Sequence, residues 1–158
     1  MLDLEEYFPF QLDPFQIEAI KAINSGNSVV LTAPTGSGKK LIGEFAIYRG
    51  LSHKSRVFYT TPLKALSNQK FRDFINQFGE KKVGRLTGDI SINRDAPILV
   101  MTTEIFRNML YGEFEEFDDP LVNLESVILD ECHYMNDPQR GTVSVSYTHL
   151  TLPTTPYV

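Results

Sequence analysis

A-P-T-G-S-G-K-K, the stretch from Ala33 to Lys40, indicates the fold more strongly than any other part of the sequence. It follows the apolar run 28–32 and precedes the amphipathic stretch 41–50, an order that predicts a strand, a glycine-rich turn and a helix. Successive backbone N–H groups in such a turn wrap an anion, and the helix dipole adds to the attraction. The sequence therefore predicts a phosphate-binding loop for a nucleotide, made by Pro34, Thr35, Gly36, Ser37, Gly38 and Lys39.

Two residues depart from the full phosphate-loop pattern, G-x-x-x-x-G-K-[ST]. Ala33 replaces the first glycine, and Lys40 stands where a hydroxyl should coordinate Mg²⁺. Lys39 fits the pattern and would reach the outer phosphates. The Lys40 ammonium cannot donate an oxygen to a metal, so we expect weak nucleotide binding with Mg²⁺ and slow hydrolysis. One base change converts a threonine codon to a lysine codon, so a sequence error and a real inactivating residue are equal alternatives.

Length and composition fit one soluble globular domain. The chain has 158 residues, enough for a single core, and a net charge of −5, so no global basic field indicates nucleic acid. Any nucleic-acid contact would come from local groups such as helix N-termini and a few lysines. The single cysteine, Cys132, excludes an internal disulfide framework and fits a reducing compartment. No apolar run approaches the ~20 residues of a membrane span, and the acidic N-terminus lacks the basic start of a signal peptide. We therefore expect a cytoplasmic protein.

Apolar strands alternate with amphipathic helices along the chain. Strands are expected at 29–32, 56–60, 82–86, 97–101 and 126–130, and helices begin near Pro14, Leu41, Leu63 and Thr103. This order predicts an α/β fold, with a parallel sheet and helices on both of its faces. Ligands of such sheets bind at the carboxyl ends of the strands.

A second polar motif, Asp130-Glu131-Cys132-His133, directly follows an apolar strand. An enzyme that uses a magnesium nucleotide needs a carboxylate on the metal and a base near the attacking water. Asp130 suits the metal, and Glu131 suits the base. Acidic residues are also common at helix starts, which would explain four such residues alone. Together with a phosphate loop upstream, they favour a nucleotide site.

From about Phe8 to Val143, the chain resembles the first RecA-like lobe of a DExH-box helicase of superfamily 2, of the superkiller-type branch. The resemblance implies a P-loop NTPase fold, truncated after the DExH strand, that uses ATP and Mg²⁺. It implies that Phe10 stacks on adenine and that Gln16 hydrogen-bonds the adenine edge, although Gln16 also fits a helix capping box. It assigns catalytic roles to Lys39 and Glu131, and it implies that His133 couples the nucleotide site to a second lobe.

Three further segments resemble the nucleic-acid motifs of this family: Thr61-Pro-Leu-Lys-Ala-Leu66, Thr87-Gly88-Asp89 and Thr102-Thr103-Glu104. Each places small hydroxyl residues and free N–H groups where a strand meets a helix, which suits a phosphate backbone and reads no bases. Turn or cap formation explains each segment alone, but their joint order supports the resemblance. The implied contacts are Thr61, Pro62, Lys64, Gly88, Asp89, Thr102 and Thr103.

The resemblance implies an ATP-driven motor whose two RecA-like lobes close on ATP around a single strand. This chain supplies one lobe, without the arginine fingers of the second. An ATP-dependent RNA helicase is the leading interpretation, because the run 133–141 looks more like the RNA-processing branch than the DNA-repair branch. The alternatives are a DNA helicase or translocase of the same superfamily, and a non-hydrolysing nucleotide- or RNA-binding module, which Lys40 supports.

The chain changes character after Arg140, because no charged residue follows it. The run from Val145 to Thr154 reads as the translation of a sequencing-library adaptor, GTC-TCT-TAT-ACA-CAT-CTG-ACG-CTG-CCG-ACG. We therefore expect 1–143 to be a partial helicase ATP-binding domain and 144–158 to be a non-native, irregular tail. In the family, the strand of the next motif lies between the phosphate-loop strand and the DExH strand. A chain that stops near Val143 would leave two apolar strand edges facing a gap, and we expect it to be unstable alone.

Overall fold

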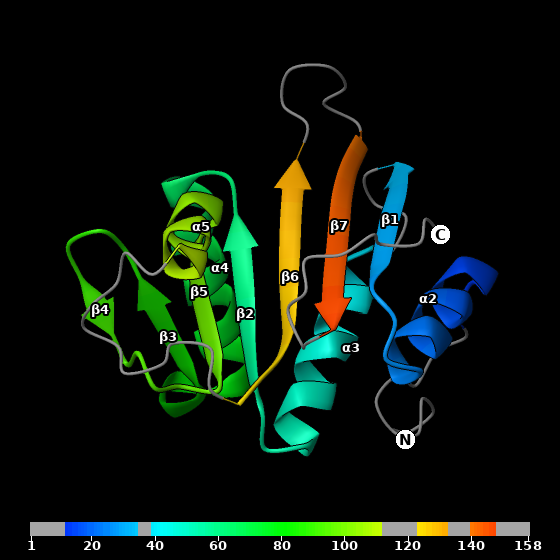
Figure 1. The fold of residues 1–158 in the computed structure, drawn as a ribbon, viewed down its shortest axis with the longest axis horizontal. Helices are drawn as coiled ribbons and strands as arrows, with labels where there is room; N and C mark the ends of the chain where they lie inside the picture. The colour runs from blue at the N-terminus through cyan, green and yellow to red at the C-terminus, as the bar shows by residue number, and fades with distance from the viewer. Residues whose placement is uncertain (1–11, 35–38, 112–122, 133–139, 148–158) are drawn as a thin grey trace.

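A seven-stranded sheet forms the centre of the protein (Figure 1). The computed structural model describes residues 12–34, 39–111, 123–132 and 140–147, and within them the side chains of 12–29, 40–111 and 123–130. The strand order is β1-β7-β6-β2-β5-β3-β4. The strands are β1 (Val29–Pro34), β2 (Arg56–Thr61), β3 (Val83–Leu86), β4 (Ser91–Ile92), β5 (Ile98–Thr102), β6 (Leu124–Cys132) and β7 (Arg140–Tyr147).

The helices lie close to where the sequence predicts them. They are α2 (Pro14–Asn24), α3 (Lys39–Ser52), α4 (Lys64–Phe78) and α5 (Thr103–Leu110), with a short 3-10 turn at Glu80–Lys82. Gly26, with φ of 81°, follows the end of α2, and Gly79, with φ of 96°, ends α4. Glycine adopts this left-handed conformation without the steric cost that a side chain adds.

Alternate residues along each central strand face opposite sides of the sheet. On β2, Val57 and Tyr59 belong to one apolar cluster and Phe58 to the other. Residues of α2, α3 and α4 complete the first cluster, and residues of α5 complete the second. The expected layers, with helices on both faces of the sheet, are therefore confirmed.

Five strands of the sheet run in one direction. Strands β6, β2, β5 and β3 are parallel, and β1 shares their direction because both β1 and β6 pair with β7 antiparallel. Only residues 133–139 connect β6 to β7. A parallel connection needs a crossover of a dozen or more residues, so this short link forces an antiparallel pairing.

Strand β7 corrects one expectation about the end of the chain, because residues 144–147 are not irregular but continue β7. In the whole chain β7 fills the position between β1 and β6, and the gap expected for a chain that stops near Val143 stays a prediction, since half of β7 lies beyond Val143. Thr, Val and Tyr favour extended backbone, and β7 satisfies the N–H and C=O groups that the two neighbouring strands would otherwise leave unpaired. The rest of the expected tail, 148–158, lies outside the described residues.

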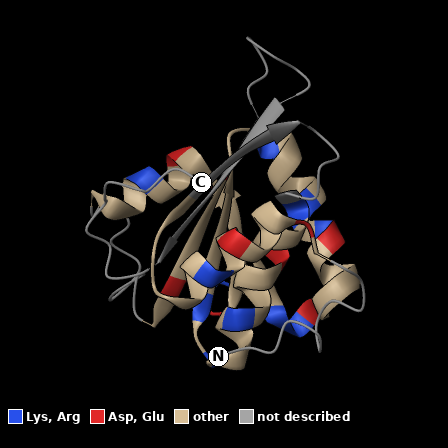
Figure 2. Cartoon of the chain, turned by 90° about the vertical axis from the view of Figure 1, so that its right-hand side faces the viewer, with Lys and Arg blue, Asp and Glu red and all other residues tan. Residues whose placement is uncertain are grey.

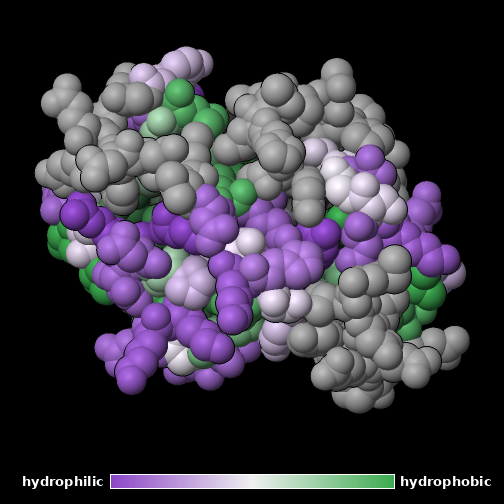
Figure 3. Space-filling model, turned by 60° about the horizontal axis from the view of Figure 1, so that its bottom comes forward, coloured by the Kyte–Doolittle hydropathy of each residue, from purple (hydrophilic) through white to green (hydrophobic). Residues whose placement is uncertain are grey.

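A buried ion pair joins α3 to β6 near the amino ends of the parallel strands. Arg49 Nη1 lies 3.1 Å from Glu125 Oε1, and the two side chains are 8% and 7% exposed. The Arg49 Nε donates to Asn24 Oδ1 at 3.3 Å, and His53 Nδ1 contacts the same Glu125 oxygen. The described surface at this end of the sheet is largely hydrophilic (Figure 3).

Glu125→Ala is expected to lower the free energy of unfolding by about 3 kcal/mol, because the substitution leaves the Arg49 charge buried without this carboxylate. Urea denaturation followed by circular dichroism measures the effect. The matched control is Glu44→Ala, which removes a partly exposed pair with Lys40 and should cost less than about 0.5 kcal/mol. Equal effects of the two substitutions would contradict a structural role for the buried pair.

Candidate functional site

The predicted motifs lie at one edge of the sheet, because the parallel strands all end there. Thr61 on β2 is the register partner of Thr102 on β5, and Thr60 is the partner of Leu129 on β6, one residue before Asp130. On the far side of β5, β3 ends at Leu86, directly before the Thr87-Gly88-Asp89 turn. The structure therefore brings the candidate metal carboxylate and the three predicted nucleic-acid segments to neighbouring strand ends.

Asp130 is half-buried near the carboxyl end of β6. The hydroxyl of Tyr59, on the adjacent strand β2, donates to Asp130 Oδ2 at 2.5 Å. Sequence reasoning missed Tyr59, because nothing in an apolar strand marks one aromatic residue as a partner of a distant carboxylate. Only the register of the strands reveals this contact.

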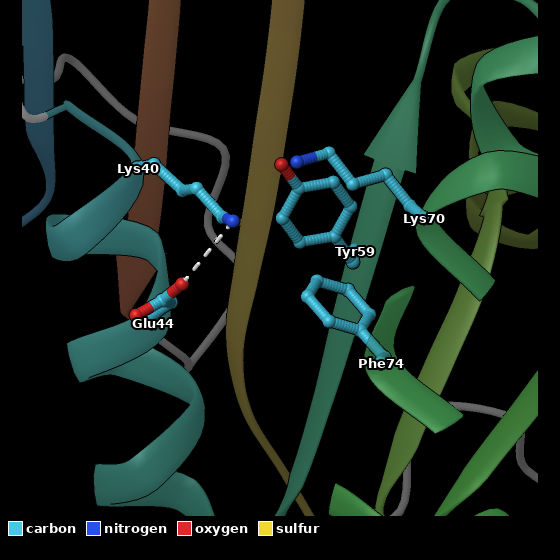
Figure 4. A pocket seen from close by; sticks show the side chains of 5 residues that line it. All are labelled: Lys40, Glu44, Tyr59, Lys70 and Phe74. Atoms are coloured by element: carbon cyan, nitrogen blue, oxygen red, sulfur yellow. Dashed lines mark ion pairs between the residues drawn. The ribbon is translucent and has the colours of Figure 1, made fainter. Parts of the chain in front are cut away.

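Lys40 lies at the start of α3, beside a small pocket (Figure 4). Its Nζ is 3.7 Å from Glu44 Oε1, and its side chain is 67% exposed. Figure 4 shows Lys40 and Glu44 on one side of the pocket, with Tyr59, Lys70 and Phe74 on the other. A partly exposed i,i+4 pair contributes little to stability, so this contact does not hold the Lys40 side chain in one conformation.

The described residues fit a magnesium ion only in part. Mg²⁺ prefers oxygen ligands, and Asp130 supplies a carboxylate that is already oriented by a hydrogen bond. Lys40 supplies no oxygen, so the second protein ligand of the full pattern is missing. Within the part of the chain that the structure describes, no cluster of three or more His, Cys, Asp or Glu could hold a metal. A nucleotide-bound Mg²⁺ takes most of its ligands from phosphates and water, so Asp130 alone suits that role better than a protein-only metal cage.

Several predicted nucleotide contacts lie outside the described residues: Phe10, Thr35, Gly36, Ser37, Gly38 and His133. The backbones of Pro34, Lys39 and Glu131 are described, at the end of β1, the start of α3 and on β6, but their side chains are not. Gln16 is 5% exposed, and its Oε1 accepts from the Asp13 N–H at 2.8 Å. The capping-box alternative for Gln16 is therefore realised, and its contact with adenine stays a prediction.

The three predicted threonine contacts are mainly engaged within the protein. Thr61 is 1% exposed, and its hydroxyl bonds the Leu63 carbonyl at 3.0 Å and the Ser67 hydroxyl at 2.6 Å. The Thr102 hydroxyl caps α5 by accepting from the Ile105 N–H. The Thr103 hydroxyl oxygen is buried and has no hydrogen-bond partner in the described structure. The Thr61 and Thr102 hydroxyls therefore stabilise the local structure, and contacts of the three threonines with a nucleic acid stay predictions.

Four other predicted nucleic-acid contacts are exposed: Pro62, Lys64, Gly88 and Asp89. The turn that carries Gly88 is closed at both ends, because the Thr87 N–H donates to the Ile90 carbonyl at 2.9 Å and the Ile90 N–H to the Thr87 hydroxyl at 3.0 Å. The predicted tight polar turn is therefore confirmed. Basic and acidic residues are interspersed over the side of the molecule shown in Figure 2, in keeping with the absence of a global basic field.

Comparisons with known proteins and protein families give matches over most of the chain. The DEAD/DEAH box helicase family model matches residues 13–156. The chain is 51% identical to the DExH-box ATP-dependent RNA helicase DExH15, chloroplastic, of Arabidopsis thaliana, over 90% of this chain and 13% of that protein. It is 48% identical to the ATP-dependent RNA helicase mtr4 of Schizosaccharomyces pombe, over 86% of this chain and 12% of that protein. It is 47% identical to the antiviral helicase SKI2 of Saccharomyces cerevisiae, over 86% of this chain and 10% of that protein.

Proposed function

Because the chain belongs to the DEAD/DEAH box helicase family, we propose that it forms the ATP-binding part of the first RecA-like lobe of an ATP-dependent RNA helicase. The chain spans 10–13% of the length of the three relatives named above, so strand translocation and unwinding are proposed for a longer protein that also carries a second lobe. Alone, this chain would lack the arginine fingers of that lobe and would be impaired in hydrolysis. The observation that carries the proposal is the convergence of Asp130, Pro34, Thr61 and Thr102 at one edge of the parallel sheet.

Each residue of the proposed nucleotide site has a separate role. The loop from Pro34 to Gly38 would wrap the phosphates with its N–H groups, and Lys39 would neutralise the outer phosphates. Glu131 would orient the attacking water and accept its proton. Mg²⁺, when bound, would neutralise charge on the phosphates, with Asp130 as its carboxylate ligand. Phe10 and Gln16 would contact adenine.

The proposed nucleic-acid contacts lie beside the nucleotide site, where the parallel strands β2, β5 and β3 end. Pro62, Lys64, Gly88 and Asp89 are exposed there, Thr102 and Thr103 are half-buried, and Thr61 is buried. Helix N-termini and lysines suit a sugar-phosphate backbone, and His133 would couple these contacts and the nucleotide site to the second lobe. RNA is favoured over DNA because two of the relatives are named RNA helicases.

The proposal also includes a cytoplasmic location and a non-native origin for the last residues of the chain. No helix in the described segments is long and apolar enough to span a bilayer. The single cysteine fits a reducing compartment such as the cytoplasm, whereas the name of the Arabidopsis relative assigns that protein to the chloroplast. We keep the adaptor origin of 144–158 as a proposal, and the genomic reading frame beyond codon 143 tests it and also determines codon 40.

Lys40 supports a second candidate function, a module that binds nucleotide or RNA without hydrolysis. An ammonium next to the loop can attract phosphate by itself, without a divalent ion. Nucleotide affinity measured in excess Mg²⁺ and in EDTA separates the two functions, because only the helicase function requires that Mg²⁺ increase this affinity.

Lys40→Thr is expected to strengthen ADP binding in excess Mg²⁺ by about a hundredfold and to leave affinity in EDTA unchanged or weaker. The substitution supplies the missing oxygen ligand and removes a like charge beside the metal; losing even a group that only supports a metal ligand costs about 10–100-fold in metal affinity. Fluorescence titration of the chain with a methylanthraniloyl-labelled ADP measures both constants.

Lys40→Val is the matched control, because valine has the shape of threonine without the hydroxyl. Lys40→Val should remove the repulsion between the ammonium and Mg²⁺, but most of the increase in ADP affinity on adding Mg²⁺ should still be absent. Equal affinities of the two variants in Mg²⁺ would refute the assignment of position 40 to metal binding. No gain from Mg²⁺ in Lys40→Thr would favour the non-hydrolysing module.

A further inference from the structure

Tyr59 connects three elements of the candidate site. It lies on β2, its hydroxyl reaches Asp130 on β6, and its ring borders the pocket between α3 and α4 (Figure 4). We propose that Tyr59 is the positioning residue that orients the Asp130 carboxylate for a nucleotide-bound Mg²⁺. The proposal rests on the proposed function, because it takes Asp130 as the metal ligand.

The Tyr59 ring is held firmly enough to act as an anchor. Tyr59 is 6% exposed, and its ring meets that of Phe74 edge-on, with centroids 5.0 Å apart at 77°. Lys70 Nζ lies 5.6 Å from the ring centroid, and a Cβ at Gly43 of α3 would lie 3.9 Å from Tyr59 Cε2. Packing by β2, α3 and α4 thus restricts the side chain, so its hydroxyl has a defined position.

The Tyr59 hydroxyl would favour binding of the metal by the other carboxylate oxygen, Oδ1. The Tyr59 hydroxyl donates to Asp130 Oδ2, and a hydroxyl has only one proton to donate. A lone aspartate can rotate about its terminal bond, whereas the hydrogen bond to Oδ2 restricts this rotation and would leave Oδ1 to bind the metal. A partner of this kind orients a metal ligand and lowers the cost of ordering it when the ion binds.

A merely structural role is the competing explanation, because a buried tyrosine hydroxyl needs a partner in any case. The two explanations predict different results. An anchor for packing affects the stability of the fold, whereas a positioning residue affects the response of nucleotide binding to Mg²⁺. The measured quantity is therefore the gain from Mg²⁺, defined as the dissociation constant of methylanthraniloyl-ADP in EDTA divided by that in excess Mg²⁺.

The experiment uses the whole 158-residue chain carrying Lys40→Thr, so that the metal has its hydroxyl ligand. Adding Tyr59→Phe is expected to reduce the gain from Mg²⁺ about tenfold, while affinity in EDTA stays within about twofold. Tyr48→Phe is the matched control, because it also removes a tyrosine hydroxyl, one on α3 that accepts a hydrogen bond from Gln77 Nε2 of α4 at 3.3 Å. Tyr48→Phe should leave the gain unchanged.

Asp130→Asn closes a double-mutant cycle with Tyr59→Phe. If Tyr59 acts through Asp130, Asp130→Asn abolishes most of the gain, and adding Tyr59→Phe has no further effect. A full gain in Tyr59→Phe, together with a lost gain in Asp130→Asn, overturns the positioning role alone. A full gain in Asp130→Asn overturns the proposed metal site itself. Melting curves of each variant verify that it is folded, and a lowered melting temperature without a change in the gain identifies Tyr59 as structural.

Discussion

A chain that ends at residue 139 is expected to lose its cooperative thermal unfolding. Strand β7 pairs with β1 over residues 29–34 and with β6 over residues 126–132. Its removal would expose the backbone N–H and C=O groups along one edge of each strand and would separate β1 from the rest of the sheet. Domains of this kind are stable by only about 5–15 kcal/mol, so losing one central strand can remove most of that margin.

Circular dichroism during heating measures the effect, and a chain that ends at residue 147 is the control. That control keeps all of β7 and lacks only residues 148–158, so it should melt within a few degrees of the whole chain. A chain that ends at Val143 keeps half of β7 and should be intermediate. If the chain that ends at residue 139 melts cooperatively at the temperature of the control, the central position of β7 does not stabilise the protein.

The direction of β7 bears on the proposed origin of the chain end. β7 is antiparallel inside a sheet whose other central strands are parallel. If residues 144–158 are adaptor-derived, the longer protein has a different segment at this position, and a crossover connection would let that segment run parallel. The truncation experiment is independent of this question, because it tests only whether the position must be filled.

Glu131→Gln in the longer protein, in a variant that also carries Lys40→Thr, is expected to lower the rate of ATP hydrolysis about a thousandfold. The amide keeps the shape of the side chain but cannot accept a proton from the attacking water. ADP affinity should change by less than about threefold, since Glu131 acts on the water and not on the nucleotide. Steady-state hydrolysis with and without single-stranded RNA, together with ADP titration, measures both quantities.

Glu80→Gln is the matched control, because it makes the same chemical change at an exposed position in the 3-10 turn before β3, outside every predicted motif. It should leave hydrolysis within about twofold, since a surface substitution outside the site has little effect. Normal hydrolysis in Glu131→Gln would contradict the role of Glu131 as the base. Equal losses in both variants would indicate a general effect of removing a negative charge from the protein.

The helices and the parallel strands could be predicted because their signals are local. The apolar runs of β2, β5 and β6 and the capping residues Gln16 and Thr102 act within a few residues of themselves. The expected and observed element boundaries differ by only one or two residues; the strand expected at 97–101, for example, is Ile98–Thr102 in the structure. The two-residue strand β4 and the whole of β7 were missed, because their pairing depends on strands far away in the sequence.

The sequence by itself indicated the family, predicted a phosphate loop, placed Asp130 at the end of a strand and showed that position 40 lacks a hydroxyl, because each depends on which residues follow one another. Only the tertiary structure decided that β7 occupies the centre of the sheet and that Tyr59 bonds Asp130. It also showed that the Thr61 and Thr102 hydroxyls are used within the protein. The physical reason is the same in each case: strand pairing and side-chain hydrogen bonds form between residues that folding brings together, and their energies depend on distances that spacing along the chain does not encode.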